Sequence, residues 1–569
     1  MNQRVIPIAV QAPSQGPSRE RKRQAPKGRR VDPAALAEVQ RLLGDAPRRR
    51  DLLIEHLHLI NDRYGALSTA HMAALAQEMR MAQTEVYEVA SFYHHFEIVR
   101  DGEALPDTLT VRVCDGIACE LAGAQDLLAK LPAILGSDVK VIPAPCIGRC
   151  EQAPAAVVGQ FPVPNANADS VRQAVASGQT THEQEPATGF DAYLAAGGYR
   201  LLQECASGAR TADAVIAEME NSQLRGLGGA GFPAGRKWRI VRNEPGPRLM
   251  AVNIDEGEPG TFKDRTYLER DPHRFLEGML IAAWAVGIAD IYVYLRDEYH
   301  GIRGFLEREI AMLQARPPIA NMPRIHLRRG AGAYICGEES AMIESIEGKR
   351  GMPRLRPPYV AQVGLFGRPT LEHNFETLYW VRDILEKGGA WFSSHGRHGR
   401  KGLRSFSVSG RVKKPGVHLA PAGITIQELI DEFCGGMQDG HAFYAYLPGG
   451  ASGGILPATM NDIPLDFDTL QPYGCFIGSA AVVVLSDQDK VTDAARNLMR
   501  FFRDESCGQC TPCRAGTAKT LQLIQHDHWD AALIGDLSQV MRDASICGLG
   551  QAAPNPVDCV IKYFPHELA

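Results

Sequence analysis

Two sets of cysteines in this sequence have the spacing of iron–sulfur or metal ligands. In the C-terminal set, Cys507, Cys510 and Cys513 are separated from one another by two residues, and Cys547 follows farther along the chain. Three thiolates on one tight loop, joined by a distant fourth, are typical of a [4Fe–4S] cluster. A zinc ion is the alternative, but three cysteines at this spacing crowd one tetrahedral ion. We therefore predict a [4Fe–4S] cluster here.

The N-terminal set consists of two close pairs, Cys114 with Cys119 and Cys146 with Cys150. Two such pairs on neighbouring loops can converge on one site. Four thiolates hold either a [2Fe–2S] cluster or a zinc ion, and the spacing alone leaves both open. A thioredoxin-type redox dithiol is disfavoured, because this unit contains no Cys-x-x-Cys sequence.

A glycine-rich stretch, Leu224–Trp238, has the composition of a loop that binds a flat cofactor with a phosphate tail. Glycines let backbone N–H groups approach a phosphate closely. Phe232 offers an apolar face for stacking, and Lys237 offers a positive charge on a long stem. The glycine spacing also matches the dinucleotide-binding fingerprint, but that motif needs a preceding strand and Ala214–Glu220 has a helical pattern. The glycines concerned are Gly226, Gly228, Gly229 and Gly231.

Length and composition bound the class of protein. A chain of 569 residues is too long for one hydrophobic core, so we expect about three to five domains. The 45% apolar and 22% charged residues are typical of a globular protein, and a net charge of −5 gives no case for nucleic-acid binding. No apolar run reaches membrane-spanning length and no secretory signal is visible, so we expect a cytoplasmic protein without a membrane partner. The thirteen cysteines, clustered at short spacings, favour metal or redox chemistry over disulfides.

The N-terminal part begins with a basic arm and a helical segment. Residues 1–30 are rich in Arg, Lys, Pro and Gln, which predicts a disordered tail that is either solubilising or docks on an acidic partner subunit. Residues 33–100 show helical apolar spacing, with Ser68 and Thr84 as the expected N-caps.

An α/β unit is expected to position the N-terminal cysteines. Thr108–Cys114, Val139–Ile142 and Ala155–Val158 alternate like strands, and Ala122–Leu131 has a helical pattern. The first cysteine pair begins at the end of the first strand, and the second pair follows the second strand.

A strand–helix–strand unit is expected to position other residues of the same ligand-binding site as the glycine loop. Ile291–Leu295, Gly304–Ala315 and Arg324–Leu327 have the patterns of strand, helix and strand, which predicts a right-handed βαβ unit. Gly330–Ala333 follows the second strand, and Glu338–Ile346 begins a helix. A loop-to-helix junction at the carboxyl end of a strand is where α/β sheets bind ligands.

The C-terminal part is first strand-rich and then helical. Residues 404–487 contain four strand patterns and one helical stretch, and no catalytic constellation is visible among them, so we expect a spacer or docking role. Residues 490–569 have helical patterns around the C-terminal cysteine set. The remaining cysteines are expected to be small buried residues. They are Cys205, Cys336, Cys434, Cys475 and Cys559.

Four stretches, in order along the chain, resemble the NADH-oxidising flavoprotein subunit of respiratory complex I and its soluble relatives. They are Leu224–Trp238, Asn253–Arg265, Gly330–Ser340 and Glu505–Gly516. The N-terminal helices and cysteine pairs resemble the small flavoprotein partner, which is a thioredoxin-like [2Fe–2S] ferredoxin. This resemblance favours [2Fe–2S] over zinc, and together the two cover nearly the whole chain.

The resemblance implies a multidomain α/β fold. Its expected parts are a basic disordered arm (1–30), a helical bundle (31–105), a thioredoxin-like [2Fe–2S] domain (106–178), a linker (179–200), a Rossmann-like FMN- and NAD-binding domain (201–402), a β-grasp domain (403–488) and a helical [4Fe–4S] domain (489–569).

The resemblance also implies the cofactors FMN, NAD, [2Fe–2S] and [4Fe–4S] and assigns their residues. The implied FMN contacts are Gly226, Gly228, Gly229, Lys237, Asn253, Asp255, Glu256, Tyr334, Gly337 and Asn374. The implied NAD contacts are a stacking face on Phe232 and the side chains of Glu258, Glu338, Glu339 and Arg356. The implied cluster ligands are Cys114, Cys119, Cys146 and Cys150 for [2Fe–2S], and Cys507, Cys510, Cys513 and Cys547 for [4Fe–4S]. Carboxylates accept ribose hydroxyls and repel a 2′-phosphate, which favours NAD over NADP.

Two positions depart from the family pattern. His373 stands where a second asparagine is usual, before Asn374, and this substitution can alter hydrogen bonding to the flavin. Leu227 stands where an arginine is usual in the glycine loop, which removes a charge near the phosphate.

The parts together predict an electron-transfer enzyme. A nicotinamide transfers two electrons as hydride, iron–sulfur clusters move one at a time, and a flavin does both, so it belongs between them. The fusion of the two flavoprotein units, and the stretch Arg368–Trp380, most closely resemble the NAD-binding diaphorase (beta) subunit of soluble molybdenum- or tungsten-dependent formate dehydrogenases. That likeness implies a molybdopterin-containing catalytic (alpha) partner, and no formate site is visible in this chain.

Three alternatives remain at this point. The first is the diaphorase subunit of an NAD-reducing hydrogenase, which can be fused in the same way. The second is a complex I flavoprotein, whose units are usually separate chains. The third is an iron–sulfur scaffold without flavin, against which the intact glycine loop argues.

Overall fold

The computed structural model describes residues 28–103, 106, 109–526 and 528–568. The basic arm predicted for residues 1–30 therefore lies almost entirely outside the described residues. Near its end, the Arg29 guanidinium donates a hydrogen bond to Thr69 Oγ1 at 2.8 Å and pairs with Asp101. Among the described residues, no helix combines the length and the apolar character that crossing a bilayer requires.

A bundle of helices opens the described chain. Its members are α1 (Pro33–Leu43), α2 (Leu53–Tyr64), α3 (Thr69–Glu78) and α4 (Gln83–Ala90). Ser68 caps α3 as predicted, because its Oγ accepts a hydrogen bond from the backbone N–H of the third helical residue. The prediction for Thr84 is wrong, because α4 begins at Gln83 and Thr84 is already its second residue. Glu85 there accepts a hydrogen bond from the backbone of Ala82, which places the start of the helix before Thr84.

An N-terminal α/β unit follows, with strand order β4-β3-β5-β6. Its strands are β3 (Leu109–Cys114), β4 (Val139–Ala144), β5 (Ala156–Val158) and β6 (Phe161–Val163), and its helices are α5 (Ile117–Leu121), α6 (Ala124–Leu135) and α7 (Ala168–Ala176). β3 pairs parallel with β4 and antiparallel with β5. The strands predicted from alternation are present, and β6, which contains Pro162, is an addition that was not predicted.

The segment predicted as a linker, residues 179–200, is packed in its second half. It contains α8 (Phe190–Ala195), and both Phe190 and Tyr193 are buried. The Phe190 backbone N–H donates to Glu309 Oε2 at 2.8 Å, and the Tyr193 hydroxyl donates to Glu277 Oε2 at 2.5 Å. Two buried aromatic side chains therefore hold this part of the segment against the next domain.

A parallel-sheet domain forms the centre of the chain. Its strands are β7 (Arg248–Ile254), β8 (Ile288–Leu295), β9 (Arg324–Arg329) and β10 (Thr370–Asn374), in the order β10-β7-β8-β9. All three pairings are parallel, and Val252 on β7 lies between His373 on β10 and Val293 on β8. β8, α14 (His300–Ala315) and β9 form the predicted strand–helix–strand unit. The carboxyl ends of all four strands consequently meet at one edge.

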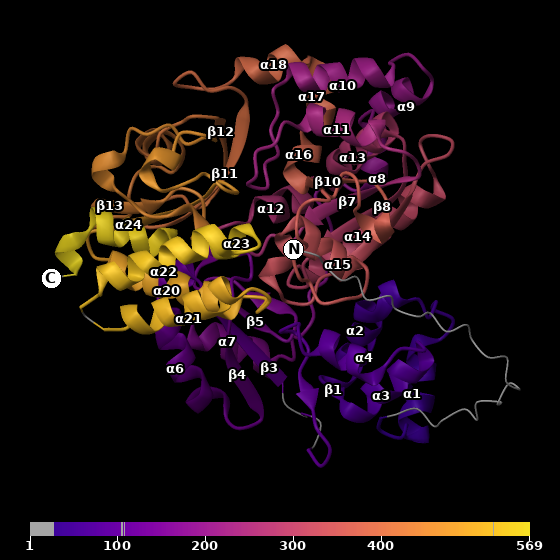
Figure 1. Cartoon of the computed structure of the whole chain (residues 1–569), viewed down its shortest axis with the longest axis horizontal. Helices are drawn as coiled ribbons and strands as arrows, with labels where there is room; N and C mark the ends of the chain where they lie inside the picture. Colours follow the sequence, from indigo (N-terminus) through magenta and orange to yellow (C-terminus); the bar gives the residue numbers. More distant parts are fainter. Residues whose placement is uncertain (1–27, 104–105, 107–108, 527, 569) are drawn as a thin grey trace, which may run out of the picture.

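A mixed-sheet domain and a set of C-terminal helices complete the chain. The strands are β11 (Leu403–Gly410), β12 (Gly416–Pro421), β13 (Phe443–Leu447), β14 (Leu456–Pro457) and β15 (Ala481–Ser486), in the order β12-β11-β15-β13-β14. The C-terminal helices are α20 (Val491–Asp504), α21 (Thr511–Ile524), α22 (Ala531–Ala544), α23 (Gly548–Ala552) and α24 (Asn555–Tyr563). Figure 1 shows these helices, in yellow, between the mixed-sheet domain in orange and the N-terminal α/β unit in purple.

Candidate functional site

A cavity of about 440 Å³ lies at the carboxyl edge of the parallel sheet. This volume is in the range of small-molecule and cofactor sites, and this edge is where α/β sheets bind ligands. Every residue assigned to FMN or NAD from the sequence lines it. They are Gly226, Gly228, Gly229, Phe232, Lys237, Asn253, Asp255, Glu256, Glu258, Tyr334, Gly337, Glu338, Glu339, Arg356 and Asn374.

The glycine loop runs between α10 (Ala212–Asn221) and α11 (Ala234–Asn243), so a helix precedes it, as predicted. Gly228 packs so tightly that an added Cβ would lie 2.9 Å from the Asn374 Cβ, and Gly229 has φ +125°, which side chains rarely adopt. Both positions therefore require glycine. Leu227, in place of the usual arginine, is buried in the core.

Two side chains of the loop, Phe232 and Lys237, line the cavity. The Phe232 ring is 38% exposed, and the Arg236 guanidinium lies 5.7 Å from its centroid. The Lys237 ammonium donates to the Glu372 backbone oxygen at 2.9 Å and to Glu372 Oε2 at 3.0 Å. Glu372, which the sequence did not single out, therefore partly neutralises the positive charge of Lys237 inside the cavity.

Asp255 provides a test of whether the cavity fits a hydrogen-bonding ligand. Asn253 Nδ2 donates to the Gly337 oxygen at 2.8 Å, which joins the end of β7 to the loop after β9. The neighbouring Asp255 Oδ2 is buried and has no hydrogen-bond partner among the described residues. Burial raises the pKa of Asp255 well above its ordinary value. A buried acceptor of this kind needs a donor, so a cofactor with N–H or O–H groups fits here.

The Glu256 carboxylate is hydrogen-bonded to three groups within the protein. It accepts hydrogen bonds from the backbone of Asp264 at 2.8 Å and of Arg265 at 3.1 Å, at the start of α12 (Lys263–Arg270). It also accepts one from the Tyr299 hydroxyl at 2.7 Å. Glu256 therefore borders the cavity as an anchor of α12, and the direct flavin contact expected of its side chain is not supported by this geometry.

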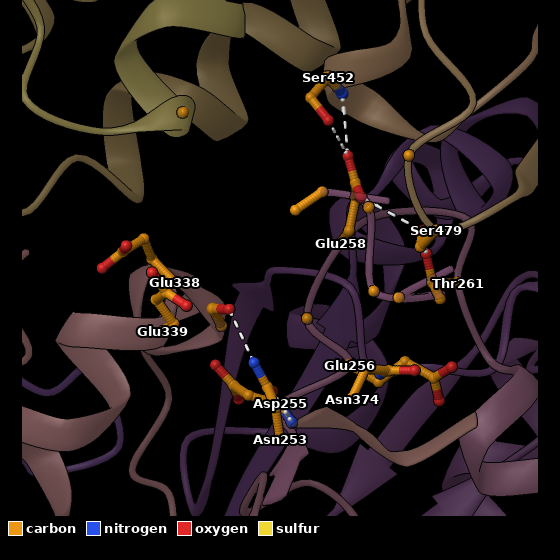
Figure 2. A pocket seen from close by; sticks show the side chains of 18 of the residues that line it. Asn253, Asp255, Glu256, Glu258, Thr261, Glu338, Glu339, Asn374, Ser452 and Ser479 are labelled. Atoms are coloured by element: carbon orange, nitrogen blue, oxygen red, sulfur yellow. Dashed lines mark hydrogen bonds between the residues drawn. The ribbon is translucent and has the colours of Figure 1, made fainter. Parts of the chain in front are cut away.

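The Glu258 carboxylate joins the parallel-sheet domain to the mixed-sheet domain. The Ser452 backbone N–H donates to Glu258 Oε1 at 3.0 Å, the Ser452 hydroxyl donates to the same oxygen, and the Ser479 hydroxyl donates to Oε2 at 3.3 Å (Figure 2). Burial raises the pKa of Glu258. Its protein partners leave it less free to meet NAD than the sequence suggested.

Residues of the mixed-sheet domain also line the cavity. They are Ser452, Phe476, Gly478 and Ser479. The expected spacer or docking role for residues 404–487 is therefore incomplete, because this domain also forms one wall of the cavity. The glycine-rich run Gly449–Gly454 was the available signal, and Gly450 lies with φ +79° directly against Glu258.

A pair of carboxylates with an arginine occupies another part of the lining. Glu338 Oε2 caps α15 (Glu339–Ile346) by accepting from Ser340 N at 3.0 Å, and its other oxygen pairs with Arg356. Arg356 Nη2 also lies 2.8 Å from Glu339 Oε1. Burial, followed by the negative charge of Glu372, raises the pKa of Glu339. Figure 2 shows Glu338 and Glu339 side by side, apart from Glu258.

His373 is hydrogen-bonded to a side chain of α11, the helix that follows the glycine loop. The Trp238 indole donates to His373 Nε2 at 2.7 Å, and both side chains are buried. Burial lowers the pKa of His373 well below its ordinary value, so the ring is neutral. Because Nε2 accepts, the ring proton is on Nδ1. His373 lines the cavity beside Asn374, whose Nδ2 donates to Asp264 Oδ2 at 3.1 Å.

The N-terminal cysteine set is gathered at one edge of its sheet, and all its members are buried. Cys114 ends β3, Cys119 lies on α5, and Cys146 follows β4. Cys146 Sγ lies 3.4 Å from Cys150 Sγ, and hydrogen bonds from Cys114 and Cys150 lower the pKa of Cys146. Within the described residues, no group of His, Cys, Asp or Glu is arranged around one point as the ligands of a single ion would be. The Cys114 thiol is also hydrogen-bonded with the Cys119 and Cys146 thiols, so the four thiols lie close together and fit the ligand set of a cluster.

The C-terminal cysteine set lies next to α23 (Gly548–Ala552), which contributes residues to the cavity lining. Cys510 precedes α21 and Cys547 precedes α23. The turn after Cys547 packs on Cys513, because a Cβ added at Gly550 would lie 2.8 Å from the Cys513 Cβ. The predicted set is therefore brought together. Three residues of α23 also line the cavity, which the sequence did not indicate; they are Gly548, Leu549 and Ala552.

The five remaining cysteines are buried, as predicted. Two of them meet across a domain boundary, with Cys475 Sγ 3.5 Å from Cys559 Sγ.

Four sequence families match this chain. Residues 39–179 match the thioredoxin-like [2Fe-2S] ferredoxin family, 219–383 the Nuo51 FMN-binding domain, 405–456 the SLBB domain, and 493–569 the NADH-ubiquinone oxidoreductase-F iron-sulfur binding region. The chain therefore carries FMN, [2Fe–2S] and [4Fe–4S] sites, and the zinc alternatives are set aside.

Whole proteins give the same assignment. An F-type component of the NADH-quinone oxidoreductase of Rhizobium meliloti is 41% identical over 391 residues, which are 66% of this chain and 92% of that protein. The mitochondrial NADH dehydrogenase [ubiquinone] flavoprotein 1 of Dictyostelium discoideum is 39% identical over 63% of this chain and 78% of its own length. A chain of a crystal structure of an NAD⁺-reducing [NiFe]-hydrogenase in the H₂-reduced state is 33% identical, with TM-score 0.80 and 92% of both chains covered. This chain thus belongs to the family of NADH-dehydrogenase flavoproteins that includes the F-type components of NADH-quinone oxidoreductases.

Proposed function

We propose that this chain is the NAD-linked electron-transfer subunit of a formate dehydrogenase, which exchanges electrons between NAD(H) and a molybdopterin-containing partner that oxidises formate. The observation that carries the electron-transfer part is that one cavity is lined both by the predicted FMN and NAD residues and by the turn after Cys547. FMN, when bound, accepts hydride and passes electrons on singly. The stretch Arg368–Trp380, which includes β10, supports the formate assignment by family likeness.

The residues of the cavity divide the binding work in this proposal. The glycine loop presents backbone N–H groups to the FMN phosphate, and Asp255 accepts a hydrogen bond from the cofactor. Phe232 provides the exposed face on which the nicotinamide nucleotide stacks. Glu338 and Glu339, beside Arg356, accept ribose hydroxyls of NAD.

The C-terminal cluster is the proposed entry point for electrons from the partner. Gly548 and Leu549 line the cavity next to Cys547, so this cluster's loop and the proposed FMN site share a wall. The reaction is reversible in this proposal, so NADH can also drive reduction of CO₂ at the partner.

A hydrogenase diaphorase is the second candidate, and a specific observation favours it. The solved NAD⁺-reducing [NiFe]-hydrogenase chain covers 92% of this chain, so the match spans both of the flavoprotein units that are fused here. In that case the partner would carry nickel and iron instead of molybdopterin, with the same cavity and clusters in this chain.

The purified chain loaded with FMN and both clusters is expected to transfer electrons from NADH to ferricyanide and not to reduce NAD⁺ with formate. The reason is that the described part of the chain holds a hydride-accepting site and one-electron outlets but shows no formate site. Adding a molybdopterin-containing formate-oxidising subunit is expected to restore formate-dependent NADH formation, measured by absorbance.

Two results would change this assignment. Formate-dependent NAD⁺ reduction by the chain alone would contradict the proposed division of labour. If only a nickel–iron hydrogenase partner supports NADH formation, the second candidate, a hydrogenase diaphorase, would be the function of this chain.

Replacing Glu339 with glutamine is expected to relax a preference for NADH over NADPH. Glu339 lies in the cavity beside Glu338, and its negative charge repels a 2′-phosphate, an effect on the order of 1–3 kcal/mol for a partly desolvated pair. The measurement is kcat/KM for NADH and NADPH with ferricyanide.

The matched control is Glu344→Gln on the same helix. Glu344 pairs with Arg354 and Lys349 and is absent from the cavity lining, so its loss should leave the preference unchanged. Unchanged NADPH kinetics in Glu339→Gln would assign the repulsion to another carboxylate.

A further inference from the structure

The loop that carries half of the [2Fe–2S] ligands is held by side chains of the parallel-sheet domain. Arg296, just after β8, donates through Nη2 to the Cys146 backbone oxygen at 2.6 Å. Arg265, on α12, donates through Nε to the Gly148 backbone oxygen at 2.9 Å. Two carbonyl groups of the segment Cys146–Cys150 are therefore bound by guanidinium groups from a different domain.

This contact excludes water. Both arginine side chains are 3% exposed. Phe262, which is fully buried, packs in one apolar cluster with Cys146 and Cys150. Gly148 has φ +73°, and a Cβ added there would lie 2.4 Å from the Tyr299 hydroxyl oxygen. Charges at such a boundary are poorly screened by solvent and salt.

The Arg296 guanidinium is shared between the cysteine loop and the Glu298 carboxylate. Glu298 accepts from Arg296 Nη2 at 2.8 Å and from Nε at 3.1 Å. The remaining terminal nitrogen, Nη1, donates to the Glu256 backbone oxygen at the cavity wall. The guanidinium thus joins Cys146 to Glu256, and Glu298 balances its charge.

We infer that Arg296 and its counter-ion Glu298 set the reduction potential of the [2Fe–2S] cluster from across the domain boundary. Reduction adds a negative charge to the cluster, and potentials of such clusters depend on nearby charge, hydrogen bonding and solvent exposure. Arg296 favours the reduced state and Glu298 opposes it. The inference rests on the [2Fe–2S] site and is independent of which partner subunit the chain has.

The test is an EPR-monitored redox titration of the full chain with both clusters loaded. Arg296→Gln is expected to shift the [2Fe–2S] midpoint to lower potential, and Glu298→Gln is expected to shift it to higher potential. The [4Fe–4S] midpoint, measured in the same sample, should stay unchanged. Arg328→Gln is the matched control, because Arg328 is also buried but pairs with Asp51 in the helical bundle.

Shifts of opposite sign separate an electrostatic role from a merely structural one. Loss of packing would alter both variants in the same direction or broaden the spectrum without a defined shift. Unchanged midpoints in both variants with an intact [2Fe–2S] spectrum would overturn the inference. If Arg296→Gln does not retain the cluster, the sign in Glu298→Gln decides, and an unchanged or lowered midpoint there also overturns it.

Discussion

Replacing Cys510 with serine is expected to abolish the [4Fe–4S] signal while leaving the [2Fe–2S] signal at full intensity. Cys510 precedes α21 in the C-terminal helices, whereas the N-terminal set is gathered around β3, so the two sites share no residue. Cluster ligation depends on thiolates that serine cannot replace with equal affinity. Cys114→Ser is expected to give the reciprocal result. The measurements are EPR of the dithionite-reduced protein and iron content per chain.

A cysteine outside both sets provides the control for these variants. Cys434 is buried in the mixed-sheet domain and belongs to neither set, so Cys434→Ser should retain both signals. Loss of both signals in Cys510→Ser would show that the clusters depend on each other for assembly. Zinc in place of iron at the N-terminal set would contradict the [2Fe–2S] assignment.

Replacing Lys263 with methionine is expected to lower the free energy of unfolding by about 3–5 kcal/mol, as for other broken buried ion pairs. Lys263 is 1% exposed, with its Nζ 2.6 Å from Asp264 Oδ1 and 3.2 Å from Glu376 Oε2. Without the ammonium group, the buried carboxylates of Asp264, at the wall of the cavity, and of Glu376 lose their positive partner. Urea unfolding of the variant and the parent chain, followed by circular dichroism, measures the difference.

The loss of stability in this variant should depend on pH. Burial raises the pKa of Asp264 from 3.8 to about 7, against the lowering effect of Lys263. A carboxyl group with a raised pKa binds more protons in the folded state, so its contribution to stability falls as pH rises through this interval. Removing Lys263 raises that pKa further. The variant should therefore lose more stability at about pH 8 than at about pH 5.

An exposed lysine gives the comparison for Lys263. Lys130 pairs with Asp126 at 2.9 Å, but the side chains are 64% and 78% exposed. Lys130→Met should change the unfolding free energy by less than about 1 kcal/mol. Equal effects of the two substitutions would mean that the Lys263 ammonium does not stabilise the buried carboxylates of Asp264 and Glu376.

Features encoded by local pattern are predictable from the sequence. One of the four strand patterns within residues 404–487 is Phe443–Leu447, whose apolar residues are bounded by turn formers, and β13 has those bounds in the structure. The glycine loop is recognisable because close backbone packing requires glycine, and Gly228 does meet Asn374. The cysteine sets are recognisable because cluster ligands have short, repeated spacings.

Features that depend on contacts between distant segments are not predictable in the same way. Nothing in the sequence around Glu258 indicates that Ser452, in another domain, donates to it. Lys237 and Glu372 likewise meet only because α11 packs beside β10. The motif around Glu256 assigns it to the flavin, but its carboxylate is taken by Tyr299 and the backbone of α12. Charge pairing across the fold follows from packing, which local pattern does not specify.

The order in which the cavity's walls occur along the chain constrains how the protein is made. The glycine loop is synthesised midway, whereas Leu549 and Ala552 belong to the last part of a 569-residue chain. On the ribosome, the FMN cavity therefore lacks a wall until the C-terminal helices have emerged and packed. The [2Fe–2S] ligands are complete by Cys150 and can receive iron much earlier. The order of the chain therefore allows the N-terminal cluster to be inserted before the flavin.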